Sequence, residues 1–220
     1  MEQFKYYSFD LWETLITRNP AFRSKRDNIF FKTFNPQSKS FEEVSEIVSG
    51  CGKEGSLCSE LSGTQVTCKH MIFNALVKLG VTDINAQMLS LIEARIQELF
   101  IQNPPILYAG TKDTLKALFE RDATLSLVSN TGYVLGETIT EALSILGIRK
   151  YFSYLIYSDE LGISKPNPQI FQKLLSLNKP KKPMDVMHVG DNVNADGGCK
   201  HLKINYYQIN SNKSLITDLI

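Results

Sequence analysis

The sequence predicts an α/β protein with a mostly parallel sheet and a second, smaller unit that is all helical. Two observations support this. Short apolar segments alternate with helical patterns after residue 104, the order that βαβ units produce. One more apolar segment lies near the N-terminus, and the stretch between the two contains no convincing strand. We therefore expect a core domain of residues 1–17 and 104–220, with a helical domain of residues 18–103 inserted after the first strand.

Five segments have the features of short buried strands. Each is rich in β-branched or aromatic residues and is bounded by turn-forming residues. The segments are residues 4–9, 124–128, 154–157, 186–189 and 205–209.

Three helices are expected between the strands of the core. Residues 111–121 begin at Thr111, a suitable N-cap, and residues 137–146 should end before Gly147. Residues 167–177 begin with an Asn-Pro pair, which suits the cap and the first turn of a helix.

The insertion has its own helical patterns. Residues 66–79 and 85–100 carry apolar side chains at the spacing of an amphipathic helix. The stretch 49–63 is small and polar, so we expect a mobile loop there. Pro104-Pro105 should close the insertion.

Composition excludes several classes of protein. The 220 residues carry 24 basic and 23 acidic side chains, a net charge of +1, so no global attraction to nucleic acid or to a membrane surface is expected. Apolar runs are too short for a membrane span, and the N-terminal residues are too polar for a secretory signal. We expect a cytoplasmic protein in which Cys51, Cys58, Cys68 and Cys199 are free thiols.

Polar residues follow four of the predicted strands. Because parallel strands end at one edge of a sheet, these residues should meet there. The set comprises Asp10 after the first strand, Ser129 and Asn130 after the second, Lys165 after the third, and Asp191 and Asp196 after the fourth.

Converging acids and a lysine have a coherent chemical use. Asp10, Asp191 and Asp196 are oxygen donors of the kind that Mg²⁺ prefers, and their mutual repulsion calls for a cation. Lys165 would steady one acid, which could attack phosphorus covalently. Taken alone, each residue also fits a turn, a helix cap or a solvated loop, and the order of all four segments is what favours a site.

Four motifs resemble those of the haloacid dehalogenase-like hydrolase superfamily. They are "FDLWETL", "LVSNT", "SDELGISKPNPQIF" and "VGDNVNADGGCKHLKI". The resemblance as a whole covers residues 4–17 and about 104–209, and the helical stretch 18–103 is similar only in type. The resemblance implies a Rossmann-like three-layer core with an α-helical cap. It implies Asp10 as nucleophile, Ser129, Asn130 and Lys165 around the phosphoryl group, and Asp196 in support of Lys165. It further implies Mg²⁺ on Asp10, Asp191 and the backbone carbonyl of Trp12, with Trp12 also bordering a small phosphorylated substrate.

The first motif departs from the pattern of most phosphatases in this superfamily. They carry a second aspartate two residues after the nucleophile as general acid, whereas this chain has Trp12, whose indole cannot act as one. Glu13 could replace the acid, the reaction could proceed without one, or the chain could bind phosphate weakly or without catalysis. Trp12 could also simply pack beneath the cap.

The fourth motif favours phosphorus chemistry. Halide displacement needs no divalent cation, and the dehalogenase branch usually lacks the Gly-Asp pair that this chain has at residues 190–191. We rank Mg²⁺-dependent phosphoryl hydrolysis first, dehalogenation or phosphonate cleavage second, and phospho-ligand binding third. Phosphonate cleavage would need a cap lysine, for which five positions are available: Lys25, Lys32, Lys39, Lys53 and Lys69.

The start of the insertion should influence substrate choice. A basic cluster lies there, and Arg18 or Arg23 could hold an anionic substrate if it faces the site, although a solvated helix face is the alternative. The cluster consists of Arg18, Arg23, Lys25 and Arg26. The cap should open and close around residues 16–20 and 103–107.

Overall fold

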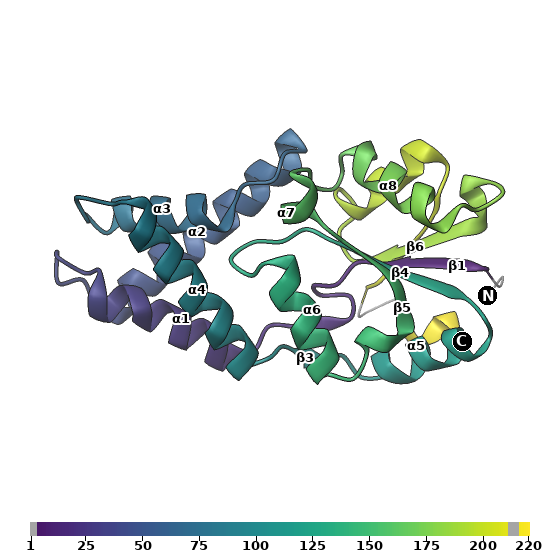
Figure 1. Ribbon diagram of the computed structural model, residues 1–220, viewed down its shortest axis with the longest axis horizontal. Helices are drawn as coiled ribbons and strands as arrows, with labels where there is room; N and C mark the ends of the chain where they lie inside the picture. The colour runs from purple at the N-terminus through teal and green to yellow at the C-terminus, as the bar shows by residue number, and fades with distance from the viewer. Residues whose placement is uncertain (1–3, 211–215) are drawn as a thin grey trace.

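A five-stranded parallel sheet lies at the centre of the fold, in the order β5-β4-β1-β6-β7. The computed structural model describes residues 4–210 and 216–220. All five predicted strands are present, with small shifts at their ends: β1 (Tyr6–Phe9), β4 (Thr124–Ser129), β5 (Phe152–Tyr157), β6 (Val186–Gly190) and β7 (Asn205–Gln208). The strand from the N-terminal segment, β1, occupies the middle of the sheet (Figure 1).

Helices cover both faces of the sheet, so the three-layer α/β class is confirmed (Figure 1). On one face lie α8 (Pro168–Asn178) and the 3-10 helix η3 (Asp196–Leu202), and on the other lie α5 (Thr111–Glu120) and α6 (Gly136–Ile145). Alternate strand residues face opposite layers: Leu127 belongs to one buried cluster and Val128 to the other. Short helices complete this unit: α7 (Ser158–Leu161), η1 (Arg149–Tyr151), η2 (Pro183–Asp185) and η4 (Ile216–Leu219).

Four helices that lie between β1 and β4 in the chain form a bundle beside the sheet (Figure 1). We call them, with their connections, the cap; they are α1 (Pro20–Thr33), α2 (Phe41–Ser62), α3 (Cys68–Lys78) and α4 (Ala86–Gln102). The rest of the chain is called the core. The chain passes from core to cap and later back again, and these two connecting segments pair with each other. They form a short antiparallel pair of strands, β2 (Ile16–Thr17) and β3 (Ile106–Leu107). The domain boundaries at residues 18 and 103 stay a prediction.

The predicted loop at residues 49–63 was wrong, because α2 is helical through Ser62 and ends at Gly63. Two of its glycines, Gly52 and Gly55, allow close packing. A Cβ atom on Gly52 would lie 2.8 Å from the ring of Tyr133, and one on Gly55 would lie 2.6 Å from the side chain of Met71. Contacts with distant residues therefore outweigh the low helix propensity of this segment.

The predicted helix starts had mixed outcomes. Asn167 caps α8, with its side chain accepting a hydrogen bond from Gln169 N. Thr111 is not a cap: Gly110 holds that position in a left-handed conformation, and the Thr111 hydroxyl donates to the carbonyl of Leu15 instead. The Thr111 hydroxyl thus bonds to the carbonyl of a residue far away in the chain, Leu15, and does not cap its own helix.

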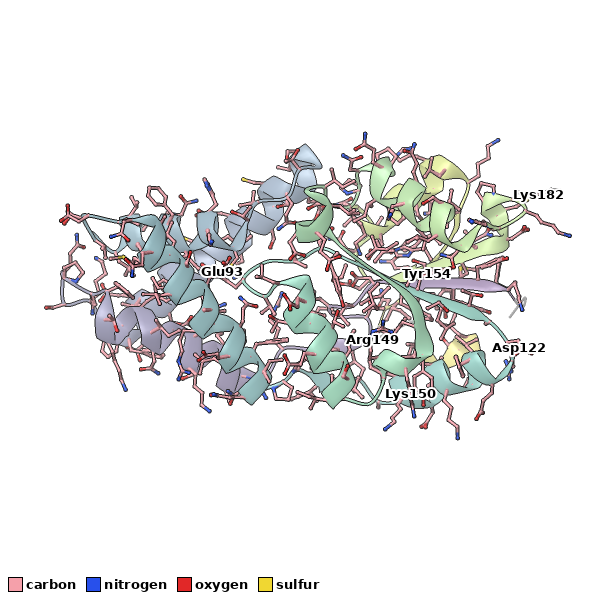
Figure 2. The ribbon with its side chains drawn as sticks, in the orientation of Figure 1. Glu93, Asp122, Arg149, Lys150, Tyr154 and Lys182 are labelled. Atoms are coloured by element: carbon pink, nitrogen blue, oxygen red, sulfur yellow. The ribbon has the colours of Figure 1, made fainter. Side chains whose placement is uncertain are left out.

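The carboxyl ends of the strands face the cap. Asp122 and Lys182 precede β4 and β6, and Figure 2 shows both at the end of the molecule remote from the cap residue Glu93. Residues that follow the strands therefore lie between core and cap. All four cysteines are free, as predicted. Within the part of the chain that the structure describes, no helix has the length and apolar character needed to cross a membrane.

Candidate active site

Lys165 connects two acids at the carboxyl end of the sheet. Its Nζ atom donates to Asp10 Oδ1 and to Asp196 Oδ1, each at 2.6 Å. The lysine is 1% exposed and the two acids are also buried. Asp191 completes the group, since one carboxylate oxygen from each of the three acids lies within 4.8 Å of the others. The convergence expected from the strand ends is thus present for these four residues.

Backbone pairing places these side chains. The N–H of Asp10 donates to the carbonyl of Val189 on the neighbouring strand at 2.8 Å, which extends the ladder between β1 and β6 by one residue. Asp191 directly follows β6. The loop with Lys165 is held by Asn130, whose amide oxygen accepts from Lys165 N at 2.8 Å while its amide nitrogen donates to Lys165 O at 3.0 Å.

The charges of this group suit a divalent cation. Three carboxylates face one ammonium group, and the ligand atoms are all oxygen, the donor type that Mg²⁺ favours. Burial raises the pKa of Asp10 to about 7, although Lys165 acts in the opposite direction. Burial and the nearby Asp196 also raise the pKa of Asp191. A bound cation would lower both pKa values, because it favours the charged form of each carboxyl group.

A hydrogen-bond chain that the sequence reasoning missed supports Asp196. His188 Nε2 lies 3.2 Å from Asp196 Oδ1, and His188 Nδ1 lies 2.9 Å from Ser8 Oγ. Burial lowers the pKa of His188, so the ring is neutral at neutral pH and donates from Nε2 to the carboxylate. Ser8 then donates to Nδ1. A histidine inside the apolar strand "VMHVG" was a usable signal, because a buried polar side chain needs a partner.

The polar residues at the end of β4 are engaged with backbone groups. Ser129 is fully buried and its hydroxyl lies 3.3 Å from the carbonyl of Asn130. The Asn130 side chain is paired with the backbone of Lys165 and also lines the cavity described below. Their predicted contacts with a phosphoryl group stay predictions.

A cavity of about 480 Å³ opens between core and cap above these acids. Asp10, Asp191, Asp196 and Lys165 line its core side. Trp12 is half-buried at its wall and packs edge to face on Phe100 of α4, with ring centroids 6.1 Å apart. The proposed packing role of Trp12 beneath the cap is therefore supported, and its role toward substrate stays a prediction.

Glu13, which could replace the missing general acid, also lines this cavity. Its carboxylate accepts a hydrogen bond of 2.5 Å from the Tyr108 hydroxyl and lies 3.7 Å from Arg18 Nη1. A residue adjacent to Trp12 faces the same space because Glu13 adopts a left-handed backbone conformation, with φ of 56°. Glu13 therefore stays a candidate acid.

Two cap helices present basic side chains to the cavity. Arg23 and Arg26 from α1 line it, and Lys53 from α2 does so too. Arg26 is buried, paired with the fully buried Asp27 at 2.7 Å. Of the five lysines considered for phosphonate cleavage, Lys53 lines the cavity. Arg18 is a further lining residue, whereas Lys25 donates to Asn103 Oδ1.

A family model described as haloacid dehalogenase-like hydrolase matches residues 4–198 of this chain. The match includes β1, β4, β5 and β6 of the sheet, the cap, and every strand-end residue from Asp10 to Asp196. The chain therefore belongs to the haloacid dehalogenase-like hydrolase family.

Curated relatives share part of the sequence. The chain is 34% identical over 85 residues to the pyrophosphatase PpaX of Listeria monocytogenes, a match that covers 39% of this chain and 37% of the relative. It is 34% identical over 87 residues to human haloacid dehalogenase-like hydrolase domain-containing protein 3, covering 40% and 33%. The matched parts thus span about a third of the length of each of these relatives.

Solved structures show the same fold along 94% or more of the chain. A putative hydrolase of this family from Bacillus subtilis, YfnB, bound to magnesium, has a TM-score of 0.74 at 16% identity, covering 100% of this chain and 92% of that one. A predicted phosphoglycolate phosphatase from Haemophilus somnus has a TM-score of 0.66 at 21% identity, covering 94% and 86%. The L-2-haloacid dehalogenase of Xanthobacter autotrophicus has a TM-score of 0.63 at 15% identity, covering 94% and 78%.

Proposed function

We propose that this protein is a Mg²⁺-dependent phosphatase that hydrolyses a small phosphorylated metabolite through a phosphorylated Asp10. The observation that carries the proposal is the buried Lys165, bonded at 2.6 Å to both Asp10 and Asp196, with Asp191 beside them. The relatives named as a pyrophosphatase and as a phosphoglycolate phosphatase support the same reaction class.

In the proposed reaction, Asp10 acts as a nucleophile. Its Oδ1 atom is held by Lys165, so we assign the attack on phosphorus to Oδ2. The phosphorus–oxygen bond to the leaving alcohol breaks, and the alkoxide takes up a proton from water. Water then attacks the phosphorus of the aspartyl phosphate, which releases inorganic phosphate and restores the carboxylate. Lys165 keeps Asp10 in one orientation throughout.

Asp10 and Asp191 would hold Mg²⁺, with the backbone carbonyl of Trp12 as a third protein ligand. The three-acid donor set fits this ion, because a single lysine leaves its negative charge only partly compensated. When bound, the ion would offset charge on the phosphoryl oxygens so that an anionic carboxylate can approach. Asp196 would support Lys165, to which it is bonded.

The cavity suits a small anionic substrate. Its volume of about 480 Å³ is that of a metabolite pocket. Arg23 and Lys53 on its cap side favour a substrate with a second negative group beyond the reacting phosphate.

The test is a substrate panel with the purified 220-residue chain, in Mg²⁺ and in chelator. It contains an activated aryl phosphate, pyrophosphate, phosphoglycolate, ethyl phosphate as the analogue without the carboxylate, and 2-chloropropionate. We expect phosphate release that needs Mg²⁺ and favours the activated ester. Chloride release that chelator does not affect would instead indicate dehalogenation. Thermal stabilisation by phosphate without any turnover would indicate a binding module.

Replacing Trp12 with Asp should speed up hydrolysis of esters with poor leaving groups. The new carboxyl group would supply the missing general acid, a function that typically contributes about 10²–10⁴-fold. We expect a gain of roughly tenfold or more on ethyl phosphate and little change on the activated aryl phosphate, measured as kcat/KM. Trp12→Phe is the matched control, because it keeps an aromatic ring against Phe100 but adds no acid. An equal gain in both variants would show that space, not proton donation, limits the rate.

A further inference from the structure

A second junction joins the cap to the core away from the β2–β3 pair. The connection between α2 and α3 runs antiparallel to the core loop that leads to Lys165, with a bridge between Thr64 and Ile163. Gln65 N donates to Gly162 O, and Ser164 N donates to Gly63 O, both at 3.1 Å. We call residues 63–65 and 162–164 the seam. The cap cannot move away from the core without breaking it.

The side chain of Gln65 is the polar centre of the seam. It is 8% exposed, and its Oε1 atom accepts hydrogen bonds from Ser158 Oγ at 2.5 Å and from Ser164 Oγ at 2.8 Å. Its Nε2 atom lies 3.3 Å from the carbonyl of Thr131 and 2.6 Å from that of Val66. One cap residue therefore binds both the loop after β4 and the loop after β5.

The direction of each hydrogen bond is fixed by chemistry. An amide oxygen can only accept, so the hydroxyls of Ser158 and Ser164 both donate to Gln65. Ser158 Oγ in turn accepts from the backbone N–H of Thr131 at 2.8 Å. The seam thus needs an acceptor and a donor on the same side chain, which a carboxamide provides and a carboxylate or an apolar side chain does not.

The residues that Gln65 contacts are sequence neighbours of Lys165, which holds Asp10, and of Asn130, which holds the backbone of Lys165. Ser164 precedes Lys165, whose Nζ is bonded to Asp10. Thr131 follows Asn130, whose amide is paired with the backbone of Lys165 in both directions. Fixing the neighbours of Asn130 and of Lys165 fixes the backbone from which the Lys165 side chain reaches Asp10.

We propose that Gln65 is a positioning residue that completes the active site only while the cap is docked on the core. It acts through Ser164 and Thr131 on Lys165, and so couples cap closure to the orientation of Asp10. The effect on turnover rests on the proposed phosphatase function, whereas the effect on the two loops does not.

A second glutamine provides a matched control. Gln97 on α4 also joins cap to core with two hydrogen bonds: its Nε2 donates to Tyr133 O at 2.9 Å and its Oε1 accepts from Leu135 N at 3.0 Å. These partners are not next to Asn130 or Lys165 in the chain. Gln97→Met therefore removes a cap–core contact of the same kind without the proposed positioning effect.

The experiment compares Gln65→Met with Gln97→Met in the full chain. Activity is measured with Mg²⁺ and the best ester of the substrate panel. We expect Gln65→Met to lower kcat by between about tenfold and 10²-fold, since small misplacements of catalytic groups have effects of that size. KM should change by less than about threefold. Gln97→Met should keep kcat within about threefold of the wild-type value. This should hold even if Gln97→Met lowers the melting temperature by as much as Gln65→Met does.

Hydrogen exchange provides a readout that does not depend on turnover. In Gln65→Met, amides of residues 129–133 and 158–166 should exchange faster, whereas Gln97→Met should leave residues 158–166 unchanged. Ser164→Ala removes one donor from the core side and carries the same expectations if Gln65→Met does not fold. The proposal is overturned if both glutamine variants lose kcat equally, or if residues 158–166 exchange at the wild-type rate. A wild type without turnover, but with the expected exchange pattern, would reject only the phosphatase function.

Discussion

Asp10→Asn is expected to lower phosphate release by at least about 10³-fold. The amide keeps the shape of the side chain and can still accept a hydrogen bond from Lys165, but it has no anionic oxygen to attack phosphorus. The measurement is the initial rate on the activated aryl phosphate in Mg²⁺. Turnover within about tenfold of wild type would remove Asp10 as nucleophile.

Stability measurements separate this chemical effect from misfolding. Burial raises the pKa of Asp10 from 3.8 to about 7 in the folded protein. Between these values the folded protein holds a proton that the unfolded chain releases, so stability falls as pH rises through that window. Asparagine cannot ionise. Above pH 7 and without Mg²⁺, the variant should therefore melt no lower than the wild type.

Lys165→Met is expected to destabilise the fold by about 3–5 kcal/mol, because it leaves buried acids without their counter-charge. The lysine is 1% exposed and holds both Asp10 and Asp196. Denaturant unfolding above pH 7, without Mg²⁺, measures the loss. Lys53→Met, which removes an exposed lysine from the same cavity, should change stability by less than about 0.5 kcal/mol.

The pH dependence of this loss tests its cause. Lys165 lowers the pKa of Asp10 to its value of about 7, so in Lys165→Met that pKa lies higher and Asp10 takes up a proton while the pH is still above 7. Protonation removes one of the repelling charges, so the destabilisation by Lys165→Met should shrink as the pH falls toward 7. Adding Asp10→Asn to the same chain should recover part of the stability. A loss that stays the same across this range would point to lost packing instead of unbalanced charge.

The core of the candidate site was predictable because of how parallel sheets are built. Strands buried on both faces are mostly apolar, so the polar residues that follow them mark where they end. Asp10, Lys165 and Asp191 were found in this way, and topology then requires them to meet at one edge. No knowledge of side-chain contacts was needed for that step.

Long-range contacts explain what the sequence did not reveal. The α2 helix looks like a loop locally, since Gly52 and Gly55 are poor helix formers, and only the positions of Tyr133 and Met71 account for them. Gln65 has no distinguishing neighbours in the sequence. Its role depends on three partners that lie far along the chain, and no local pattern records such an arrangement.

The central position of β1 affects how the protein is made. Tyr6 pairs with Thr124 on one side and with Val186 on the other, so a strand synthesised first acquires its neighbours only after the whole bundle of α1–α4 has left the ribosome. Until then its apolar residues are open to association with other nascent chains. Helix-rich segments with nearby contacts fold quickly, so the bundle can assemble during this delay. The protein should therefore depend on chaperones more during translation than during refolding of the completed chain.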